Sequence, residues 1–285
     1  MADPILFIGV VSHAGSSYAG SQGESGLAAQ IAAALPDTVV HVNTRDLWTE
    51  SGQSPPDDAG LDSLNAEIQF EGTWRRYLGL PPSAQEQLRI LSRRLALFRH
   101  RRRGTLPNVE RLLNIELSHV DLLRRGLESG APYLLILEDD AECLDIKDLA
   151  AGISAIVIGS ARPDLVNLSH SFSIAELGVG SLLAPHESVA WGGTRPRSIL
   201  RTRKLITNTV CALLYSKSFA ETIHSGLTRL PTFPVLPIDW KVNKVISQLP
   251  VTSSTDACWW IDPAPVTQRS MHSLDSSSRP AILDA

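Results

Sequence analysis

The residues best suited to chemistry are three consecutive carboxylates, Glu138, Asp139 and Asp140, which directly follow an apolar run at residues 133–137. Like charges at the end of a buried strand repel one another and lose hydration, so they need a cation or several donors nearby. Side chains alternate along a strand, which predicts Glu138 and Asp140 on one side and Asp139 on the other. Two such carboxylates would suit Mg²⁺ or Mn²⁺. The alternative is an acidic turn exposed to water.

A further carboxylate, Asp239, stands between a proline-rich stretch that ends at Pro237 and the aromatic Trp240. The proline restricts the backbone and the tryptophan can supply an apolar wall, so Asp239 is a candidate general base for removing a proton from a hydroxyl group. The competing interpretation is that Asp239 caps a helix predicted over residues 241–249.

The surrounding segments alternate between strand-like and helix-like patterns, which predicts an α/β fold with a mostly parallel central sheet flanked by helices. Asn108 is expected to cap the helix that precedes the acidic strand. The expected strands cover residues 4–11, 38–42, 133–137, 165–168, 210–215 and 258–261, and the expected helices cover 26–35, 84–103, 108–130, 219–227 and 241–249.

Polar residues follow the first two expected strands. Parallel strands present their carboxyl ends at one sheet edge, where ligands commonly bind. Ser12, His13, Asn43 and Arg45 are therefore candidate binding residues, although His13 is equally well explained as a hydrogen-bonded loop residue. The glycine patterns of dinucleotide-binding and phosphate-binding loops are absent from the sequence.

Two segments concentrate positive charge. Leucines in the first recur with helical spacing, and its basic part, residues 93–103, is either a solvated helix face or a contact surface for an anionic acceptor or a peripheral membrane. The second lies within the weakly periodic stretch 171–209, where a mobile loop is expected to close over a diphosphate, unless its cations are simply solvated. Those cations are Arg195, Arg197, Arg201, Arg203 and Lys204.

Composition predicts an ordinary soluble globular protein. Of 285 residues, 43% are hydrophobic and 20% are charged, and the net charge of −4 gives no overall attraction to nucleic acid. The three cysteines are widely spaced, which argues against a disulfide framework and favours the cytoplasm. We expect no signal peptide or membrane span. We also expect one domain over residues 1–272, with a helical insertion at about 60–107 and a tail at 273–285.

Several segments, in their order along the chain, resemble the family 25 glycosyltransferases, which are lipopolysaccharide-type and collagen-type sugar transferases. That family has a Ser-His helix followed by a strand that ends in Glu-Asp-Asp. The resemblance covers roughly residues 108–273 in pieces, and the segment before Asn108 has no counterpart in it. The matching pieces are residues 114–119, 135–141, 208–216, 237–240 and 263–270.

The resemblance implies an A-type glycosyltransferase fold and transfer of a hexose, with inversion, from a nucleotide-sugar donor, a UDP-sugar being expected. It places Mn²⁺ or Mg²⁺ on Glu138 and Asp140, and it makes Asp239 the base. It also adds His119, Asp139 and Asn208 to the donor-binding residues. Glycans, lipid-linked sugars, proteins and nucleic acids all remain open as the acceptor that supplies the hydroxyl.

Two other functions fit parts of the pattern. The acidic strand end would also suit a metal-dependent phosphoryl-transfer enzyme, such as a phosphatase or a nuclease, but a phosphate loop, a nucleophile motif and a second group of metal ligands are missing from the sequence. The third possibility is an inactive transferase-like protein that binds partners through its basic helix. Metal-dependent hydrolysis of a nucleotide sugar would separate the first function from both.

Overall fold

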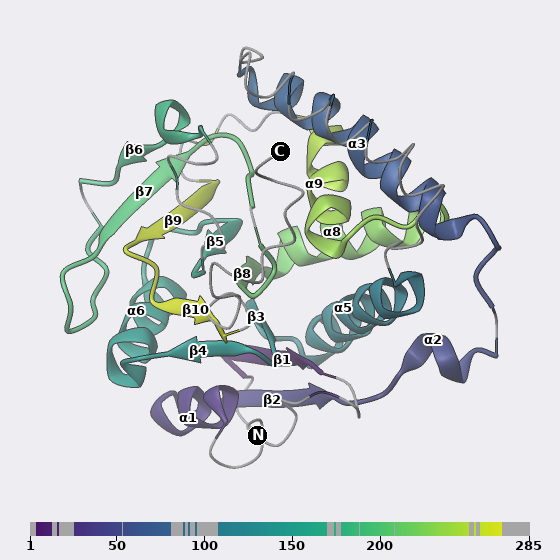
Figure 1. Cartoon of the computed structure of the whole chain (residues 1–285). Coiled ribbons are helices and arrows are strands. Elements are labelled where there is room, and N and C mark those ends of the chain that lie inside the picture. Colours follow the sequence, from purple (N-terminus) through teal and green to yellow (C-terminus); the bar gives the residue numbers. More distant parts are fainter. Residues whose placement is uncertain are drawn as a thin grey trace.

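The computed structural model shows an α/β architecture, in which helices flank a large mixed sheet (Figure 1). It describes residues 4–12, 16, 26–52, 54–80, 88, 91, 95, 108–169, 174, 178–187, 189–207, 209–250, 254 and 257–269. The predicted α/β class is confirmed.

The large sheet has eight strands in the order β2-β1-β3-β8-β5-β9-β7-β6, and β10 and β4 form a separate two-stranded sheet. The strands are β1 (Leu6–Val11), β2 (Thr38–Asn43), β3 (Tyr133–Glu138), β4 (Ala141–Cys143), β5 (Leu165–Asn167), β6 (Ala184–Pro185), β7 (Ser198–Thr202), β8 (Ala212–Ser216), β9 (Cys258–Asp262) and β10 (Val266–Gln268).

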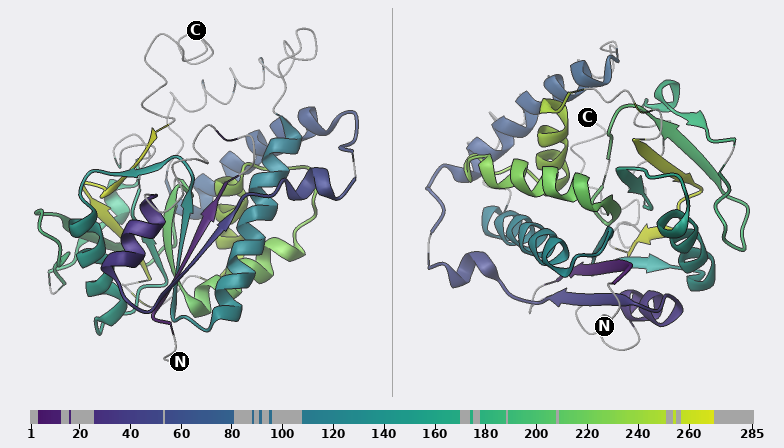
Figure 2. Two further views of the ribbon diagram at one scale, coloured as in Figure 1. Left: turned by 90° about the horizontal axis from the view of Figure 1, so that it is seen from below. Right: turned by 180° about the vertical axis from the view of Figure 1, so that it is seen from behind.

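Helices cover both faces of the large sheet, with α1 and α6 on one face and α3, α5, α8 and α9 on the other (Figure 2). The helices are α1 (Leu27–Ala34), α2 (Leu47–Glu50), α3 (Ala59–Leu78), α5 (Val109–Ser129), α6 (Ile146–Ile158), α8 (Lys217–Arg229) and α9 (Ile238–Gln248), with a short 3₁₀ helix, η2 (Gly180–Leu182).

Strand direction differs from the prediction. β1 pairs in parallel with β2 and β3, and β5 pairs in parallel with β9. However, β8 runs antiparallel to both β3 and β5, and β7 runs antiparallel to both β6 and β9. The prediction of a mostly parallel sheet was therefore wrong. A continuous apolar run indicates that both faces of a strand are covered, but it carries no information about the direction of the neighbouring strand.

Alternating side chains of the central strands build a separate core on each face. Within β3, Leu134 and Ile136 join the core under α5, α8 and α9, whereas Tyr133, Leu135 and Leu137 join the core under α1 and α6. All five side chains are almost completely buried. This double burial explains why the acidic residues at the end of β3 follow such a long apolar run.

Helix α5 brings the Ser-His segment onto the sheet. It begins as predicted at Asn108, whose Oδ1 accepts a hydrogen bond from the Arg111 N–H at 3.0 Å, and it ends at Gly130 with a left-handed φ of 81°. Close packing on β1 and β3 requires a glycine at position 126, because an added Cβ would lie 2.4 Å from Leu134 Cδ2.

The insertion predicted over residues 60–107 begins with α3, but most of residues 81–107 lie outside the described part of the chain. The tail predicted at 273–285 also lies outside it. Among the described residues, none of the helices combines the length and the apolar character that crossing a membrane requires.

Candidate functional site

The parallel strands β2, β1 and β3 end together at one edge of the sheet. Val11, the last residue of β1, pairs with Asn43 on one side and with Glu138 on the other. The Ser12 N–H donates to the Asn43 carbonyl at 2.9 Å. Ser12, Asn43 and Glu138 therefore occupy neighbouring positions along this edge, which the order of the strands brings together.

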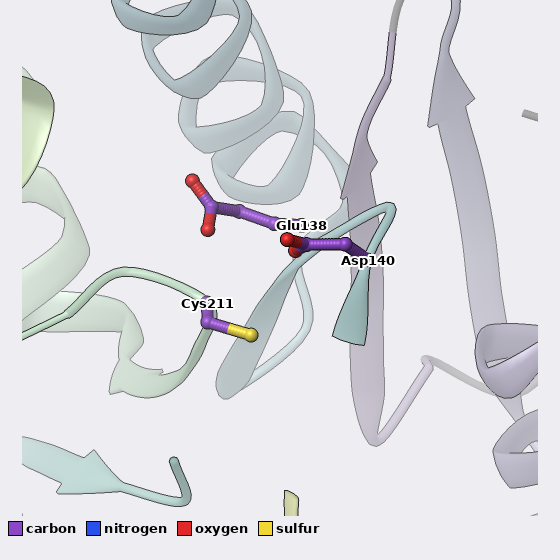
Figure 3. Close-up of side chains that lie close together, drawn as sticks. All are labelled: Glu138, Asp140 and Cys211. Atoms are coloured by element: carbon purple, nitrogen blue, oxygen red, sulfur yellow. The ribbon is translucent and has the colours of Figure 1, made fainter. Parts of the chain in front are cut away.

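Beside this edge, three side chains form a compact group. One potential ligand atom from each of Glu138, Asp140 and Cys211 lies within 4.8 Å of the others. Figure 3 shows them converging from the end of β3, the turn after it and the segment that leads into β8. The Glu138 N–H donates to the Cys211 carbonyl at 2.9 Å, so backbone pairing fixes these two residues against each other.

Glu138 lies in an environment that disfavours its negative charge. Removal from water raises the pKa of Glu138 to about 8, and the charges of Asp140, Asp239 and Asp139 add to the increase, whereas Arg111 opposes it. Gln268 Nε2 donates a hydrogen bond to Glu138 Oε2 at 3.1 Å. One amide donor does not balance the neighbouring carboxylates, so a cation would stabilise the ionised form.

The donor set fits a hard divalent cation. Glu138 and Asp140 offer carboxylate oxygens, which Mg²⁺ and Mn²⁺ prefer. Burial, followed by the charges of Glu138 and Asp140, raises the pKa of the Cys211 thiol, so this sulfur remains protonated at neutral pH. A neutral thiol is a poor ligand for these ions. The two carboxylates are therefore the residues that could hold the metal.

Asp139 faces a different partner from its two neighbours. Its Oδ2 accepts a hydrogen bond from Ser12 Oγ at 2.8 Å, which links the turn after β3 to the end of β1. The separation of Asp139 from Glu138 and Asp140 follows the alternation predicted from the strand. Ser12 and Asp139, both predicted to bind the donor, thus lie in direct contact.

Asp239 reaches this region from the first turn of α9. The helix begins at Ile238 and its N-cap is Pro237, so Asp239 is not the N-cap that the competing interpretation assumed. Burial raises the pKa of Asp239 to about 6, although backbone hydrogen bonds at Trp240 and at Asp239 itself act in the opposite direction. The charge of Asp239, which stands 101 residues after Glu138 in the sequence, contributes to the raised pKa of Glu138.

His119 is buried within α5. Its side chain is 2% exposed, and burial lowers its pKa to about 3, so the imidazole is neutral. Nε2 of this ring has no hydrogen-bond partner within the described part of the chain. Leu122 of α5 packs over Gly9 of β1. Helix α5 precedes β3 and runs back against the direction of the parallel strands β1 and β3. His119, almost one turn before Leu122, therefore lies nearer the carboxyl ends of these strands.

Arg45 is turned toward another partner than the acidic group. The exposed Arg45 forms an ion pair with Glu50, while the Arg45 backbone N–H donates to Asn43 Oδ1 at 3.1 Å. His13 and Asn208 lie outside the described residues.

The second basic segment is built into the fold, so the predicted mobile loop over residues 195–204 was wrong. Residues 198–202 form β7, and the Arg197 side chain, 8% exposed, is paired with the buried Asp148 at 2.7 Å. Lys204 Nζ donates to the carbonyls of Tyr77 and Leu78 in the last turn of α3. The sequence did not reveal these contacts. The segment has no clear helix or strand periodicity, and the partners of Arg197 and Lys204 lie far away in the sequence.

The first basic segment, residues 93–103, falls outside the described residues apart from Leu95. Leu88, Leu91 and Leu95 are helical and are 66%, 53% and 54% exposed. These three leucines of the predicted apolar face are therefore not packed on the core.

Two residues that contact Glu138 were not predicted from sequence. Cys211 and Gln268 both lie in segments that contributed to the family resemblance, but neither was given a role there. Strand pairing places Cys211 opposite Glu138, and the β4–β10 pair brings Gln268 opposite Ala141. The only indication in the sequence that Cys211 and Gln268 lie near the site was that their segments belong to the family resemblance.

Comparison of the chain with protein-family models and with curated proteins found no match.

Proposed function

We propose that this protein is a metal-dependent glycosyltransferase that moves a hexose from a nucleotide-sugar donor, a UDP-sugar being the expected one, to an acceptor hydroxyl. One observation carries the proposal most directly. Ligand atoms of Glu138, Asp140 and Cys211 lie within 4.8 Å of one another at the end of β3, beside Asn43, which ends β2, and Ser12, which follows β1. A metal-dependent transfer uses such a carboxylate pair to hold the cation, and inversion also needs a separate base, for which Asp239 is the candidate.

Glu138 and Asp140 would hold the divalent cation. When bound, such a cation neutralises the negative charge that develops on the departing diphosphate. The raised pKa of Glu138 supports this role, since a carboxyl group whose surroundings disfavour its negative charge is stabilised in the ionised form by a bound cation.

Asp239 would accept the proton of the acceptor hydroxyl. A base must be ionised at the working pH, and a pKa of about 6 leaves Asp239 mostly ionised at pH 7 while keeping it more basic than an ordinary aspartate. Its position on α9, outside the Glu138–Asp140–Cys211 group, leaves its carboxylate available for this task.

Residues at the ends of β1 and β2 would hold the nucleotide. Next to the carboxylate pair, the carboxyl ends of the strands carry Ser12, Asn43 and Asp139. A nucleotide-sugar donor needs polar contacts for its base and ribose beside the cation that holds its diphosphate. His13 and Arg45 stay proposed donor-binding residues because they follow the first two strands, and His119 and Asn208 stay so because of the family resemblance. A glycan, a lipid-linked sugar, a protein or a nucleic acid would supply the hydroxyl.

The first experiment measures Mn²⁺ binding by calorimetry and release of the nucleoside diphosphate from a panel of nucleotide sugars. We expect the protein to bind Mn²⁺ and to hydrolyse or transfer sugar from at least one donor in a chelator-sensitive manner. Asp140→Asn should abolish both properties and leave the circular dichroism spectrum unchanged.

Glu142→Gln is the matched control, because this carboxylate lies two residues further on, half-exposed, and pairs with Arg269 at 2.6 Å. It should retain Mn²⁺ binding and turnover. Turnover that persists in a chelator, or in Asp140→Asn, would rule out the proposed function.

A further inference from the structure

A buried side chain on α9 ties the helix of Asp239 to the segment that precedes β8. Asn243 lies four residues after Asp239, and therefore on the same face of α9. Its Oδ1 accepts from the Thr207 N–H at 3.4 Å, and its Nδ2 donates to the Thr207 carbonyl at 2.8 Å. Asn243 and Thr207 are 5% and 2% exposed. The amide thus bonds to both backbone groups of one residue.

Hydrogen bonds continue from Thr207 to the acidic group. The Thr209 N–H donates to Thr207 Oγ1 at 3.4 Å, and the same hydroxyl donates to the Thr209 carbonyl at 2.6 Å. The Cys211 N–H donates to Thr209 Oγ1 at 3.1 Å, and the Glu138 N–H donates to the Cys211 carbonyl at 2.9 Å. A continuous chain therefore links Asn243 to Glu138.

Burial makes this chain resistant to displacement. Thr209 is 5% exposed and Cys211 is fully buried, so a shift of α9 would leave polar groups without partners and without water. Each such group would lose a hydrogen bond that water cannot replace. Small displacements of α9 relative to β3 are therefore penalised at several links at once.

We infer that Asn243 is a positioning residue, which acts through Thr207 and Thr209 to hold Asp239 at a fixed distance from Glu138. The inference rests on the proposed function for its catalytic consequence, but the mechanical coupling can be tested without it. A general base misplaced by about 1 Å can lose on the order of 10²-fold in rate, so this coupling would matter for turnover.

Two variants interrupt the chain at different links. Asn243→Ala removes the amide, and Thr209→Val removes the hydroxyl that accepts from the Cys211 N–H while preserving side-chain shape. Thr209→Ser restores that hydroxyl. The control is Ile223→Val, a fully buried truncation on α8 that is expected to cost about 1 kcal/mol without touching the chain.

Amide hydrogen exchange tests the coupling directly. In Asn243→Ala, exchange should accelerate by about tenfold or more at Thr207, Thr209, Cys211 and Glu138. In Thr209→Val, it should accelerate at Cys211 and Glu138, and Thr209→Ser should reverse the change. Acceleration confined to Thr207 in Asn243→Ala, or equally large in Ile223→Val, would overturn the inference. If Asn243→Ala does not fold, the two Thr209 variants decide it.

Kinetics test the catalytic consequence. Asn243→Ala and Thr209→Val should lower kcat by about tenfold or more while the KM for the nucleotide sugar stays within about twofold, and Thr209→Ser should recover kcat. A loss of kcat no larger than that of Ile223→Val would contradict the positioning role. A wild-type protein without transfer would refute the proposed function alone, because the exchange result would still decide whether the chain couples α9 to β3.

Discussion

Individual carboxylates near the sheet edge are differentiated by their surroundings. Asp139 accepts a hydrogen bond from Ser12, whereas burial and neighbouring charge raise the pKa of Glu138. Asp239 lies on a separate element and is raised mainly by burial. Under the proposed function, Asp139 would contact the donor, Glu138 would bind the cation and Asp239 would act as the base, so substitutions at these positions should have different consequences.

Asp239→Asn should separate catalysis from binding. Because Asp239 is outside the Glu138–Asp140–Cys211 group and is not the helix N-cap, the variant should keep its Mn²⁺ and donor affinity and lose at least about 10²-fold in transfer. Turnover, donor affinity and melting temperature measured together check this. If Asp239 only supports the first turn of α9, stability falls by about 1 kcal/mol or less and turnover remains near normal.

His119 should make folding sensitive to acid. Its folded pKa is about 3 and its ordinary value is 6.5, so between these values the unfolded chain binds a proton that the folded protein excludes. Stability is therefore complete above about pH 6.5 and should fall by about 1.4 kcal/mol per pH unit below it.

His119→Gln should remove this part of the pH dependence. Urea denaturation of both proteins at pH 7, 5.5 and 4.5 measures the slopes, and carboxylates common to both cancel in the difference. Parallel slopes for the two proteins would show that His119 can be protonated in the folded state.

At the scale of elements, α5 and α9 are joined by a buried ion pair. Lys241 and Glu116 are 2% and 6% exposed, and Lys241 Nζ donates to Glu116 Oε1. Burial raises the pKa of Glu116, and the positive charge of Lys241 opposes that increase. The pair connects the helix that carries His119 to the helix that carries Asp239, on a different side of α9 from Asn243.

Breaking this pair should cost more than replacing it. Lys241→Met leaves the Glu116 carboxyl buried without its partner and should lower the free energy of unfolding by about 3–5 kcal/mol. Adding Glu116→Leu should restore most of that loss, because two apolar side chains need no counter-charge. Denaturant unfolding of both single variants and the double variant measures the coupling, and additive losses would argue against it.

At the scale of the whole molecule, one buried acid joins the connection between β6 and β7 to helix α6. Asp148, in the first turn of α6, accepts hydrogen bonds from Trp191 Nε1, the Arg195 N–H and Arg197 Nε. Burial would raise the pKa of Asp148, but these three donors lower it overall. The hairpin strand β7 pairs in turn with β9, which the C-terminal part of the chain supplies.

Asp148→Asn should loosen this hairpin. The variant leaves the buried Arg197 guanidinium without an opposite charge, at a cost of about 3 kcal/mol or more. Trypsin should then cleave after Arg197, Arg201 or Arg203 faster than in the wild type, as identified by mass spectrometry. Saturating nucleotide sugar should not change cleavage there, since these residues lie in strand β7 and its flanks. Glu142→Gln, which breaks an exposed pair, should leave cleavage unchanged.

The sequence by itself determined part of the local structure. The apolar run before Glu138 and the Asn108 cap predicted β3 and α5 with nearly correct boundaries, whereas strand β7 was missed. Alternation at the end of β3 also predicted that Asp139 would separate from its neighbours. These features succeed because they depend on backbone preferences and on burial, both of which adjacent residues express.

Only the tertiary structure decided how these elements meet. It reversed β8 between β3 and β5, and so placed Cys211 against Glu138. It paired Arg197 with Asp148 and thereby removed that cation from the predicted loop. It also brought Asp239 near the acidic group. Each outcome depends on contacts between residues far apart in the chain. The hydrophobic pattern of a strand does not specify these contacts, because the pattern is the same whether the neighbouring strand is parallel or antiparallel.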